Sequence, residues 1–344
     1  MYQEILNKLI THQELSEAEI REIISAIRVG SLREIQISGF LGAFLTKGYS
    51  RNEIAYIAKA MRDNCIPLYP QVDEDLMDTC GTGGGLSTIN ISTATAILAA
   101  SAGILIAKHG SRSVSSRCGS GDVLEALGLE IQLPACEVER MIEEIGIAFL
   151  YAPKYHPVMA KVLPVETGLG MKSIFYTIIG PLINPTFARK HLLGVCSEEM
   201  MDVITFVAQE LGFCNLMCVH GLDGLDEISL LGKTRISHLV NGVVHKYEIE
   251  PEDFGLARCK LDAIKSGSPR ENADTLFSVL NGTNRGAARN AIVLNTAGAL
   301  IVGGKAAGFA EGITLASDLL DSGAALDKLV ELRNMSQSFS TRTA

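Results

Sequence analysis

Short apolar runs alternate with helical patterns over most of this chain, and this alternation limits its possible folds more than any other feature. The runs HLLGVC and NLMCVHG flank SEEMMDVITFVAQELG, in which apolar residues recur at helical spacing. A strand, a helix and a second strand in succession form the unit of a parallel sheet covered by helices. The pattern therefore predicts an α/β architecture after about residue 70.

The first seventy residues differ because they contain helical patterns only. Ser16 with Glu19, and Ser50 with Glu53, form capping boxes, and each box precedes apolar residues at helical spacing. The N-terminus carries acidic residues early and reads as an amphipathic helix, not as a signal peptide. These residues predict a small bundle of helices.

One hairpin indicates that the sheet is not purely parallel. TRISHLV and VVHKYEIE both alternate, and Asn241-Gly242 between them suits a type I′ turn. The sheet is therefore expected to be mixed. We predict a small helical domain over residues 1–69, with which part of 160–190 packs, and a larger α/β domain over residues 70–340.

Composition argues against several classes of protein. The formal net charge of −9 opposes non-specific attraction to nucleic acid or to anionic lipid. The most apolar window, INISTATAILAASAGILIA, is interrupted by hydroxyl and amide side chains, so it predicts a buried helix and not a membrane span. We expect a cytoplasmic protein that binds neither nucleic acid nor a membrane.

The eight cysteines are scattered without a Cys-x-x-Cys pair. In a chain of this size they are expected to be buried thiols and not a disulfide framework. Cys214, Cys218 and His220 lie closest together, in an expected buried strand. A fourth ligand at suitable spacing is missing, which argues against a zinc site there.

A cluster of glycines indicates backbone that turns sharply or approaches a ligand. DTCGTGGGLSTINIST contains Gly81, Gly83, Gly84 and Gly85, followed by small hydroxyl and amide side chains. Bare backbone of this kind suits phosphate. The stretch lacks the closing Lys-Ser or Lys-Thr pair and the glycine spacing of the familiar nucleotide-binding signatures. A tight turn between packed elements is therefore an equal alternative.

Further stretches favour an anion, a metal ion and an apolar ligand. AKHGSRSVSSRCGSGDVLEALG combines Lys108, Arg112 and Arg117 with serines and glycines. In HGLDGLDEISL, the adjacent Asp226 and Glu227 could bind magnesium already held by a substrate's phosphates, although paired acids alone are usually just solvated. FLYAPKYHP and GPLINP bring aromatic rings and prolines near each other in sequence, as in a rigid apolar slot or a packed loop.

Taken together, these stretches resemble the anthranilate phosphoribosyltransferase family over almost the whole chain. The resemblance rests on the ordered motifs GTGG, NIST, KHG, RSVSS, YAPKYHP, GPLINP, LDEISL and EDFGL. It implies a fold of the nucleoside phosphorylase/phosphoribosyltransferase type, a homodimer formed through the helical domain, and a substrate site at the hinge between the domains. The implied reaction joins the amine of anthranilate to C1′ of phosphoribosyl pyrophosphate (PRPP) and releases pyrophosphate, in tryptophan biosynthesis.

The resemblance also implies a donor site and a metal site. Lys108, Asp226 and Glu227 are the implied catalytic residues, because negative charge accumulates on the departing pyrophosphate. Ser92, Asp226 and Glu227 are the implied ligands of Mg²⁺, with two ions brought by PRPP. The residues implied to bind PRPP are Gly81, Gly84, Gly85, Thr88, Asn90, Ile91, Ser92, Thr93, Lys108, His109, Gly110, Ser111, Arg112, Ser113, Val114, Ser115, Ser116 and Ser120.

The acceptor side departs from the family pattern. The residues implied to contact the acceptor are Gly81, His109, Ser111, Tyr155, Glu166 and Pro181. Ser111 and Glu166 stand where the family has asparagine and arginine, and a glutamate would repel the carboxylate of anthranilate. Lys161 or Lys172 is a candidate partner for that carboxylate.

These departures leave alternatives open. The glycine loop lacks an aspartate that the family carries, which would shift more of the metal binding to Asp226 and Glu227. A different aromatic nitrogen acceptor with the same donor chemistry is the first alternative. A non-catalytic binding protein of the same fold is the second.

Overall fold

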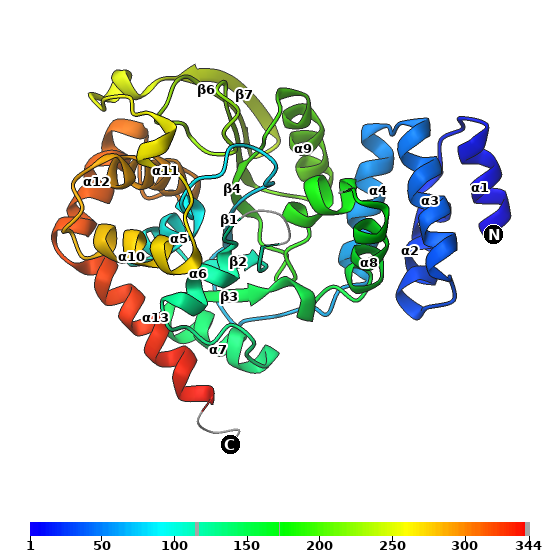
Figure 1. Ribbon diagram of the computed structural model, residues 1–344, viewed down its shortest axis with the longest axis horizontal. Coiled ribbons are helices and arrows are strands. Elements are labelled where there is room, and N and C mark those ends of the chain that lie inside the picture. Colours follow the sequence, from blue (N-terminus) through cyan, green and yellow to red (C-terminus); the bar gives the residue numbers. More distant parts are fainter. Residues whose placement is uncertain (114–116, 172, 341–344) are drawn as a thin grey trace.

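A mixed sheet organises the larger part of the molecule. The computed structural model describes residues 1–113, 117–171 and 173–340 (Figure 1). Within these residues the strands form one seven-stranded sheet in the order β3-β2-β1-β4-β5-β6-β7. The pairs from β3 to β5 are parallel and the last two pairs are antiparallel. The strands are β1 Met77–Gly81, β2 Ile106–Gly110, β3 Ile147–Tyr151, β4 Lys190–Gly194, β5 Asn215–Gly221, β6 Thr234–Val240 and β7 Val243–Ile249.

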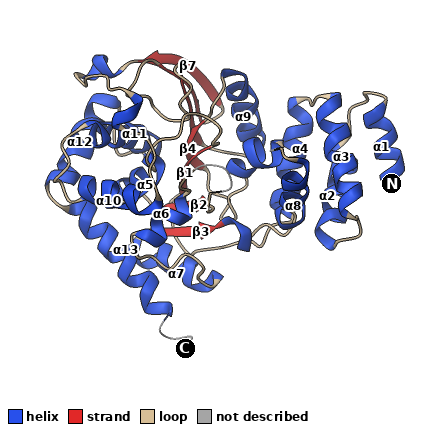
Figure 2. Cartoon of the chain, in the orientation of Figure 1, coloured by secondary structure: helices blue, strands red, loops and turns tan. Residues whose placement is uncertain are grey.

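Helices cover both faces of this sheet (Figure 2). Helices α5 (Ile91–Ser101) and α11 (Ala287–Gly303) pack on β1 and β4, and α9 (Glu198–Glu210) packs on β5 and β6. The remaining helices of this part are α6 Ser120–Ala126, α7 Ala135–Ile145, α10 Pro269–Leu280, α12 Phe309–Asp321 and α13 Ala324–Ser340. The α/β architecture and the mixed sheet predicted from the sequence are confirmed.

The N-terminal helices stand to one side of the sheet (Figure 1). They are α1 Tyr2–Ile10, α2 Glu17–Val29, α3 Glu34–Lys47 and α4 Arg51–Asp63. Helix α8 (Met159–Leu169) packs against α3, and the π-helical turn Phe175–Ile179 packs against α4. The segment 159–183 therefore shares its apolar core with the N-terminal helices.

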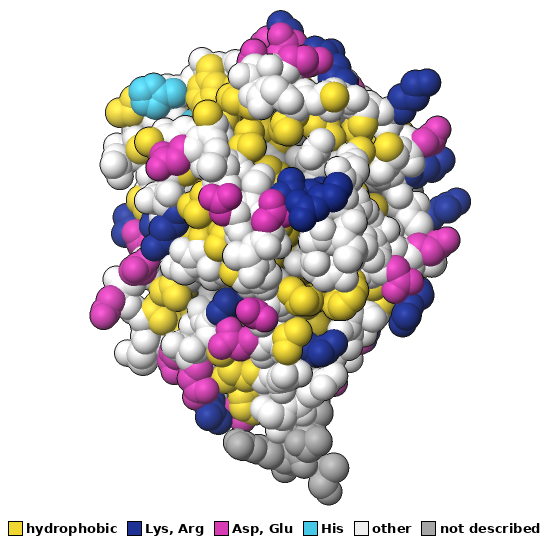
Figure 3. All heavy atoms as spheres, turned by 90° about the vertical axis from the view of Figure 1, so that its left-hand side faces the viewer, with side chains coloured by type: hydrophobic (Ala, Val, Ile, Leu, Met, Phe, Trp, Pro, Cys, Tyr) yellow, Lys and Arg dark blue, Asp and Glu magenta, His cyan; other side chains and the backbone are white. Residues whose placement is uncertain are grey.

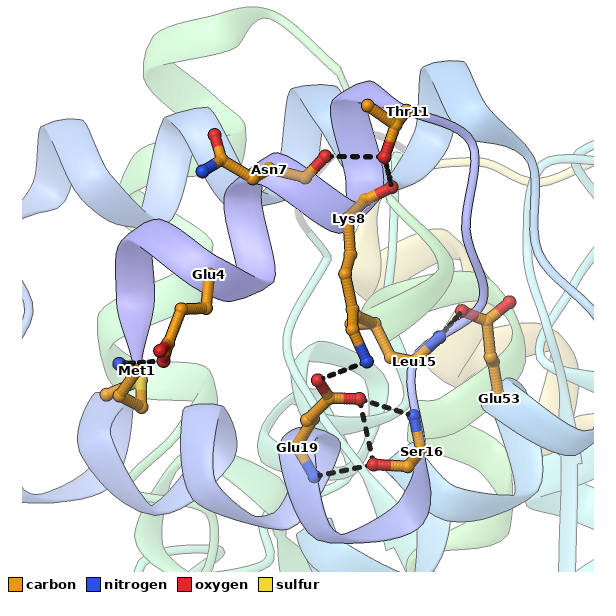
Figure 4. A network of polar contacts seen from close by, with 9 residues as sticks. All are labelled: Met1, Glu4, Asn7, Lys8, Thr11, Leu15, Ser16, Glu19 and Glu53. Carbon is orange, nitrogen blue, oxygen red and sulfur yellow. Dashed lines mark hydrogen bonds and ion pairs between the residues drawn. The ribbon is translucent and has the colours of Figure 1, made fainter.

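Polar contacts fix how these helices begin (Figure 4). The hydroxyl of Ser16 accepts a hydrogen bond from the main chain of Glu19, whose carboxylate pairs with Lys8 at 2.7 Å. Glu53 is fully buried, and its carboxylate accepts from Leu15 N at 2.9 Å and pairs with Lys47 at 2.8 Å. The predicted capping boxes are confirmed.

Two further local predictions are confirmed. Asn241 and Gly242 have φ angles of 47° and 83°, as a type I′ turn requires, and β6 and β7 pair across them. The apolar window after residue 89 contains α5, which is buried along most of its length. Among the described residues, no helix is long and apolar enough to cross a membrane.

The cysteines are all free thiols, but the prediction that all of them are buried is wrong. Cys65, Cys118 and Cys218 are buried, whereas Cys136 is exposed. Cys136 lies in the first turn of α7, whose buried positions are Val138, Met141 and Ile142. Cys136 lies outside this buried stripe and faces water, because only one stripe of an amphipathic helix reaches the core.

The face of the α/β part that points away from the N-terminal helices carries charges of both signs. Acidic and basic side chains are interspersed there with scattered hydrophobic ones (Figure 3). On this face no single sign of charge dominates.

Candidate active site

A cavity of about 340 Å³ opens where β1 and β2 end. Strands β2 and β3 follow β1 on one side of it in the sheet, and β4 lies on the other side of β1. In open α/β sheets a ligand crevice lies at such a switch point, because the connections on either side diverge there. Gly81 ends β1, Gly110 ends β2, and both line the cavity.

The glycine loop forms one wall of this cavity and lies against the acidic pair. A side chain at Gly81 would collide with the carboxylate of Asp226. Gly84 has a φ of 92°, which favours glycine, and the N–H of Gly83 donates to Oδ2 of Asp226 at 2.8 Å. The bare backbone therefore lets the loop approach both Asp226 and the cavity.

The N-terminus of α5 faces the same space. Asn90 is the N-cap residue, and Ile91, Ser92 and Thr93 of the first turn line the cavity with it. The first N–H groups of a helix have no partner within the helix, and the helix dipole places partial positive charge there. This end of α5 can therefore bind phosphate oxygens.

Lys108 brings a buried cation to the site from β2. Its side chain is 3% exposed, and Nζ donates to the carbonyl of Thr79 at 2.5 Å. Burial lowers the pKa of Lys108, while the nearby Asp78 and Glu227 favour its charged form. Such a cation can stabilise negative charge that develops in the cavity.

The loop after β2 adds hydroxyl and amide groups, but its arginine has other partners. Nε and Nη2 of Arg112 donate to the carboxylate of Glu125 at 2.8 and 2.6 Å, and Nη1 donates to the hydroxyl of Tyr151 at 3.4 Å. The hydroxyl of Ser120 donates to the carbonyl of Ser111 at 3.2 Å. Arg112 lines the cavity with its charge already paired to Glu125.

The acidic pair lines the donor end, where both residues are half-buried. Burial and then the charge of Asp226 raise the pKa of Glu227 to about 8. Burial also raises the pKa of Asp226. Two adjacent carboxylates whose charged forms are disfavoured by burial are suited to a cation.

This pair fits magnesium delivered by a substrate. The hydroxyl of Ser92 and the two carboxylates line the cavity together, and magnesium prefers such oxygen ligands. Within the described residues, no group of three or more His, Cys, Asp or Glu side chains could hold a metal ion alone. The residues present therefore fit an ion whose other ligands are water and substrate phosphates.

The other end of the cavity is apolar. Its wall consists of Ala152, Pro153, His156, Met159, Ala160, Leu163, Phe175, Tyr176, Gly180, Pro181 and Ile183. His156 Nε2 lies 3.0 Å from His109 Nε2, and burial lowers the pKa of His156 to about 4 and that of His109 well below its usual range. Both rings are therefore neutral near pH 7. Among the described lining residues, the cations are Lys108 and Arg112, and both belong to the donor end.

The cavity brings together most of the residues that the sequence singled out. Those that line it are Gly81, Gly84, Gly85, Thr88, Asn90, Ile91, Ser92, Thr93, Lys108, His109, Gly110, Ser111, Arg112, Ser113, Ser120, Pro181, Asp226 and Glu227. Val114, Ser115 and Ser116 lie outside the described residues, as does Lys172.

Tyr155 and Glu166 lie elsewhere. Neither belongs to the described lining of the cavity; Tyr155 is 2% exposed and packs in the core of the α/β part. The carboxylate of Glu166 accepts from Ser173 N at 2.9 Å, and its charge helps raise the pKa of Tyr176, chiefly raised by burial. Glu166 therefore lies near Tyr176 and outside the described lining of the cavity, and Lys161 lies beside Gly30.

Sequence reasoning missed several lining residues. Among them are Cys80, His156, Met159, Ala160, Leu163, Phe175, Tyr176 and Ile183. His156 belongs to the quoted stretch YAPKYHP, so its position in a proline-flanked aromatic run was a usable signal. The others carry apolar side chains typical of any core, and no local pattern marks them as ligand contacts.

Comparisons with known proteins agree with this architecture. The chain matches the glycosyl transferase family helical bundle domain over residues 3–65 and the a/b domain of the same family over residues 73–326. Anthranilate phosphoribosyltransferase from Acetivibrio thermocellus is 42% identical over 340 residues, which cover 98% of both proteins. The protein of that name from Thermoanaerobacter sp. is 42% identical over 333 residues, 96% of this chain and 98% of its own.

Solved structures show the same relationship. The crystal structure of anthranilate phosphoribosyltransferase from Thermus thermophilus superposes with a TM-score of 0.90 at 36% identity, covering 97% of this chain and 99% of that one. The Saccharomyces cerevisiae protein in complex with PRPP and Mg has a TM-score of 0.89 at 28% identity, covering 98% of both chains. This chain therefore belongs to the anthranilate phosphoribosyltransferase family.

Proposed function

We propose that the protein transfers the phosphoribosyl group of PRPP to the amine of anthranilate and releases pyrophosphate, a step of tryptophan biosynthesis. The observation that carries this proposal is the two-ended cavity. Its donor end combines a glycine loop, a helix N-terminus, a buried lysine and an acidic pair, and it opens directly into an apolar slot. One substrate that is rich in phosphate and one that is aromatic fit such a space.

The donor end supplies electrostatic stabilisation. As the bond between C1′ and the pyrophosphate oxygen breaks, negative charge accumulates on the leaving group and positive charge on the sugar. Lys108, the N–H groups of the glycine loop and the N-terminus of α5 are positioned before the reaction, so they need little reorganisation as charge develops. Their common role is to hold and neutralise pyrophosphate.

Ser92, Asp226 and Glu227 would hold Mg²⁺, which we propose to arrive as two ions with PRPP. Bound there, magnesium supplies positive charge that stabilises the leaving pyrophosphate. Asp226 and Glu227 are half-buried and line the cavity, so they keep this charge beside the pyrophosphate.

The acceptor end orients a neutral nucleophile and excludes water. An aromatic amine carries a free electron pair near pH 7, so no base is needed before it attacks C1′. Pro181, Leu163 and Tyr176 offer apolar and aromatic surface for the ring. Ser111 lines the same cavity, and we propose that it contacts the acceptor together with Gly81 and His109.

We propose that residues 1–69 with the 159–183 segment form one domain, that the strands and their helices form the other, and that substrates bind between them. Support comes from the packing of α8 on α3 and of the π-helical turn on α4, in an apolar cluster that also includes residues of α9 and of one face of the sheet. We also propose a homodimer through the helical part, where Ile10, Val29 and Ile35 are 62%, 71% and 73% exposed. Sedimentation at graded protein concentration tests the dimer.

The eight free thiols favour a cytoplasmic location.

The activity is tested by incubating the purified protein with PRPP, Mg²⁺ and anthranilate and measuring pyrophosphate release. We expect release that depends on all three components. A parallel reaction with aniline, which lacks the carboxylate, tests the alternative of a different acceptor. Faster release with aniline than with anthranilate would favour that alternative, and PRPP binding without release in either reaction would favour a non-catalytic binding protein.

A further inference from the structure

Residues 87–89, which connect the glycine loop to α5, are hydrogen-bonded to a segment that comes much later in the chain. Main-chain hydrogen bonds of 2.9 and 3.1 Å join residues 87–89 to residues 264–266. Thr88 and Lys265 form an isolated antiparallel bridge between them. Because Thr88 lines the cavity, this bridge fixes part of the cavity wall.

Asn272 anchors that holding segment. It lies in the first turn of α10 and is 1% exposed. Its Oδ1 accepts from Gly267 N at 2.8 Å, and its Nδ2 donates to the hydroxyl of Ser266 at 3.1 Å. The same Nδ2 donates to Oδ1 of Asn90 at 2.8 Å. The amide of Asn272 thus uses both its oxygen and its nitrogen.

Asn90 in turn contacts the loop that follows β2. Its own Nδ2 donates to the carbonyl of Cys118 at 3.3 Å, in the stretch that follows β2. Asn90 also lines the cavity and caps α5, although its side chain makes no capping hydrogen bond to that helix. The side chain of Asn90 is therefore hydrogen-bonded to Asn272 and not to the first turn of α5.

We propose that Asn272 is a positioning residue for PRPP, an inference that rests on the proposed function. It does not belong to the described lining of the cavity, yet one buried amide joins the glycine loop, the N-terminus of α5 and the loop after β2. All of these lie at the donor end. Asn272 therefore acts on the use of PRPP and not on the use of the acceptor.

The substitution Asn272→Asp separates this role from simple packing, because it preserves the shape of the side chain. The carboxylate still accepts from Gly267 N, but it places an oxygen against Oδ1 of Asn90. Two facing acceptors repel each other, so the amide of Asn90 must turn over and lose its donation to the carbonyl of Cys118. A buried network that is only partly satisfied is costly.

The experiment measures PRPP binding by calorimetry in the presence of Mg²⁺, together with KM for both substrates. For Asn272→Asp we expect PRPP affinity to fall about tenfold, because a broken buried hydrogen bond leaves a group of the donor end unsatisfied. KM for anthranilate should stay unchanged. Equal PRPP affinity in the parent and in Asn272→Asp would overturn the inference. A parent that binds no PRPP would overturn the proposed function itself.

Asn64→Asp is the matched control. Asn64 is also buried, its Nδ2 donates to the carbonyl of Ala60 at 2.8 Å, and it lies at the end of α4, outside the described lining of the cavity. We expect it to lower the melting temperature without changing KM for PRPP. If Asn272→Asp does not fold, Ser266→Ala removes one bond of the network and should weaken PRPP binding about threefold. Unchanged binding in Ser266→Ala would then overturn the inference.

Discussion

The two ends of the cavity are built in different ways. The donor end consists of loops that directly follow β1, β2 and β5, so main-chain groups and a few charges define it. The acceptor end consists of side chains from residues 152–183, which leave the sheet and pack against α3 and α4. A site made of strand ends is fixed by the sheet, whereas a site made of packed side chains depends on a neighbouring core. Substitutions at the two ends should therefore separate the use of PRPP from the use of the acceptor.

Removing the charge of Glu227 should have the largest effect at the donor end. Glu227→Gln keeps the size of the side chain but removes one of the two half-buried carboxylates that fit magnesium. We expect kcat to fall by about 100- to 1,000-fold, in the range for losing one group that stabilises transition-state charge. The measurement is pyrophosphate release at saturating PRPP and Mg²⁺. Glu199→Gln, on the exposed face of α9, is the control, and a near-parental rate in Glu227→Gln would refute the metal assignment.

Removing the positive charge of Lys108 should have the second-largest effect. Lys108→Met retains an apolar stem that fits a buried position but loses the charge near Glu227. We expect KM for PRPP to rise about 10- to 100-fold, because hydrogen bonds to a charged group contribute about 1.5–3 kcal/mol. KM for anthranilate should change little, and Lys246→Met at an exposed ion pair should change neither. An unaltered KM for PRPP in Lys108→Met would contradict the role of this lysine.

Shortening an apolar side chain should show the opposite selectivity. Leu163 lines the acceptor end from α8, while Leu169 lies exposed at the end of the same helix. Leu163→Ala should raise KM for anthranilate about tenfold, because small changes in an apolar pocket are worth about 1–3 kcal/mol. Leu169→Ala is the matched control. If Leu163→Ala altered PRPP affinity as strongly as anthranilate affinity, the two ends would not be separable.

The smallest expected effect is a pH-dependent change in stability without ligands. The pKa of Glu227 is raised from 4.5 to about 8, so between these values the folded protein holds a proton that the unfolded chain has lost. The stability that this proton contributes is fully present below about 4.5 and is lost as pH rises through 8. Glu227→Gln should therefore melt about 2 °C or more above the parent at high pH and equal it at low pH.

Thermal unfolding without Mg²⁺ at pH 5 and pH 8.5 checks this last prediction, at fixed ionic strength. The neutral His156 and His191, whose pKa values burial lowers to about 4, destabilise the fold at low pH in both proteins and cancel in the comparison. A difference in melting temperature that is the same at both pH values would show that Glu227 is not the titrating group.

Local sequence signals predicted much of this molecule because their physical causes are local. The capping box at Ser16 and the turn at Asn241-Gly242 depend on residues that are neighbours in the chain. The glycine loop and the acidic pair were also recognisable, because they occur in order with the other motifs that resemble the family. The hydrogen bond from the N–H of Gly83 to the carboxylate of Asp226 joins these two stretches. Neither stretch by itself predicts this contact.

Other features depend on distance in space and had no local signal. Glu166 was expected beside the acceptor because of its place in a motif, but the fold turns its carboxylate to the main chain of Ser173. Arg112 was expected to bind phosphate, and the fold pairs it with Glu125. In both cases the chemical type of the residue was known, and its partner was decided by packing.

The sequence by itself determined the elements and the chemistry of the donor end: helices first, then alternating strands and helices, with glycines, Lys108 and the pair Asp226 and Glu227 in or after strands. Only the tertiary structure decided that residues 152–183 close the other end, and that Asn272 ties two donor loops together. The physical reason is that hydrogen-bonded turns and strand ends obey short-range rules. Which apolar or amide side chains meet across a cavity depends on how whole layers pack.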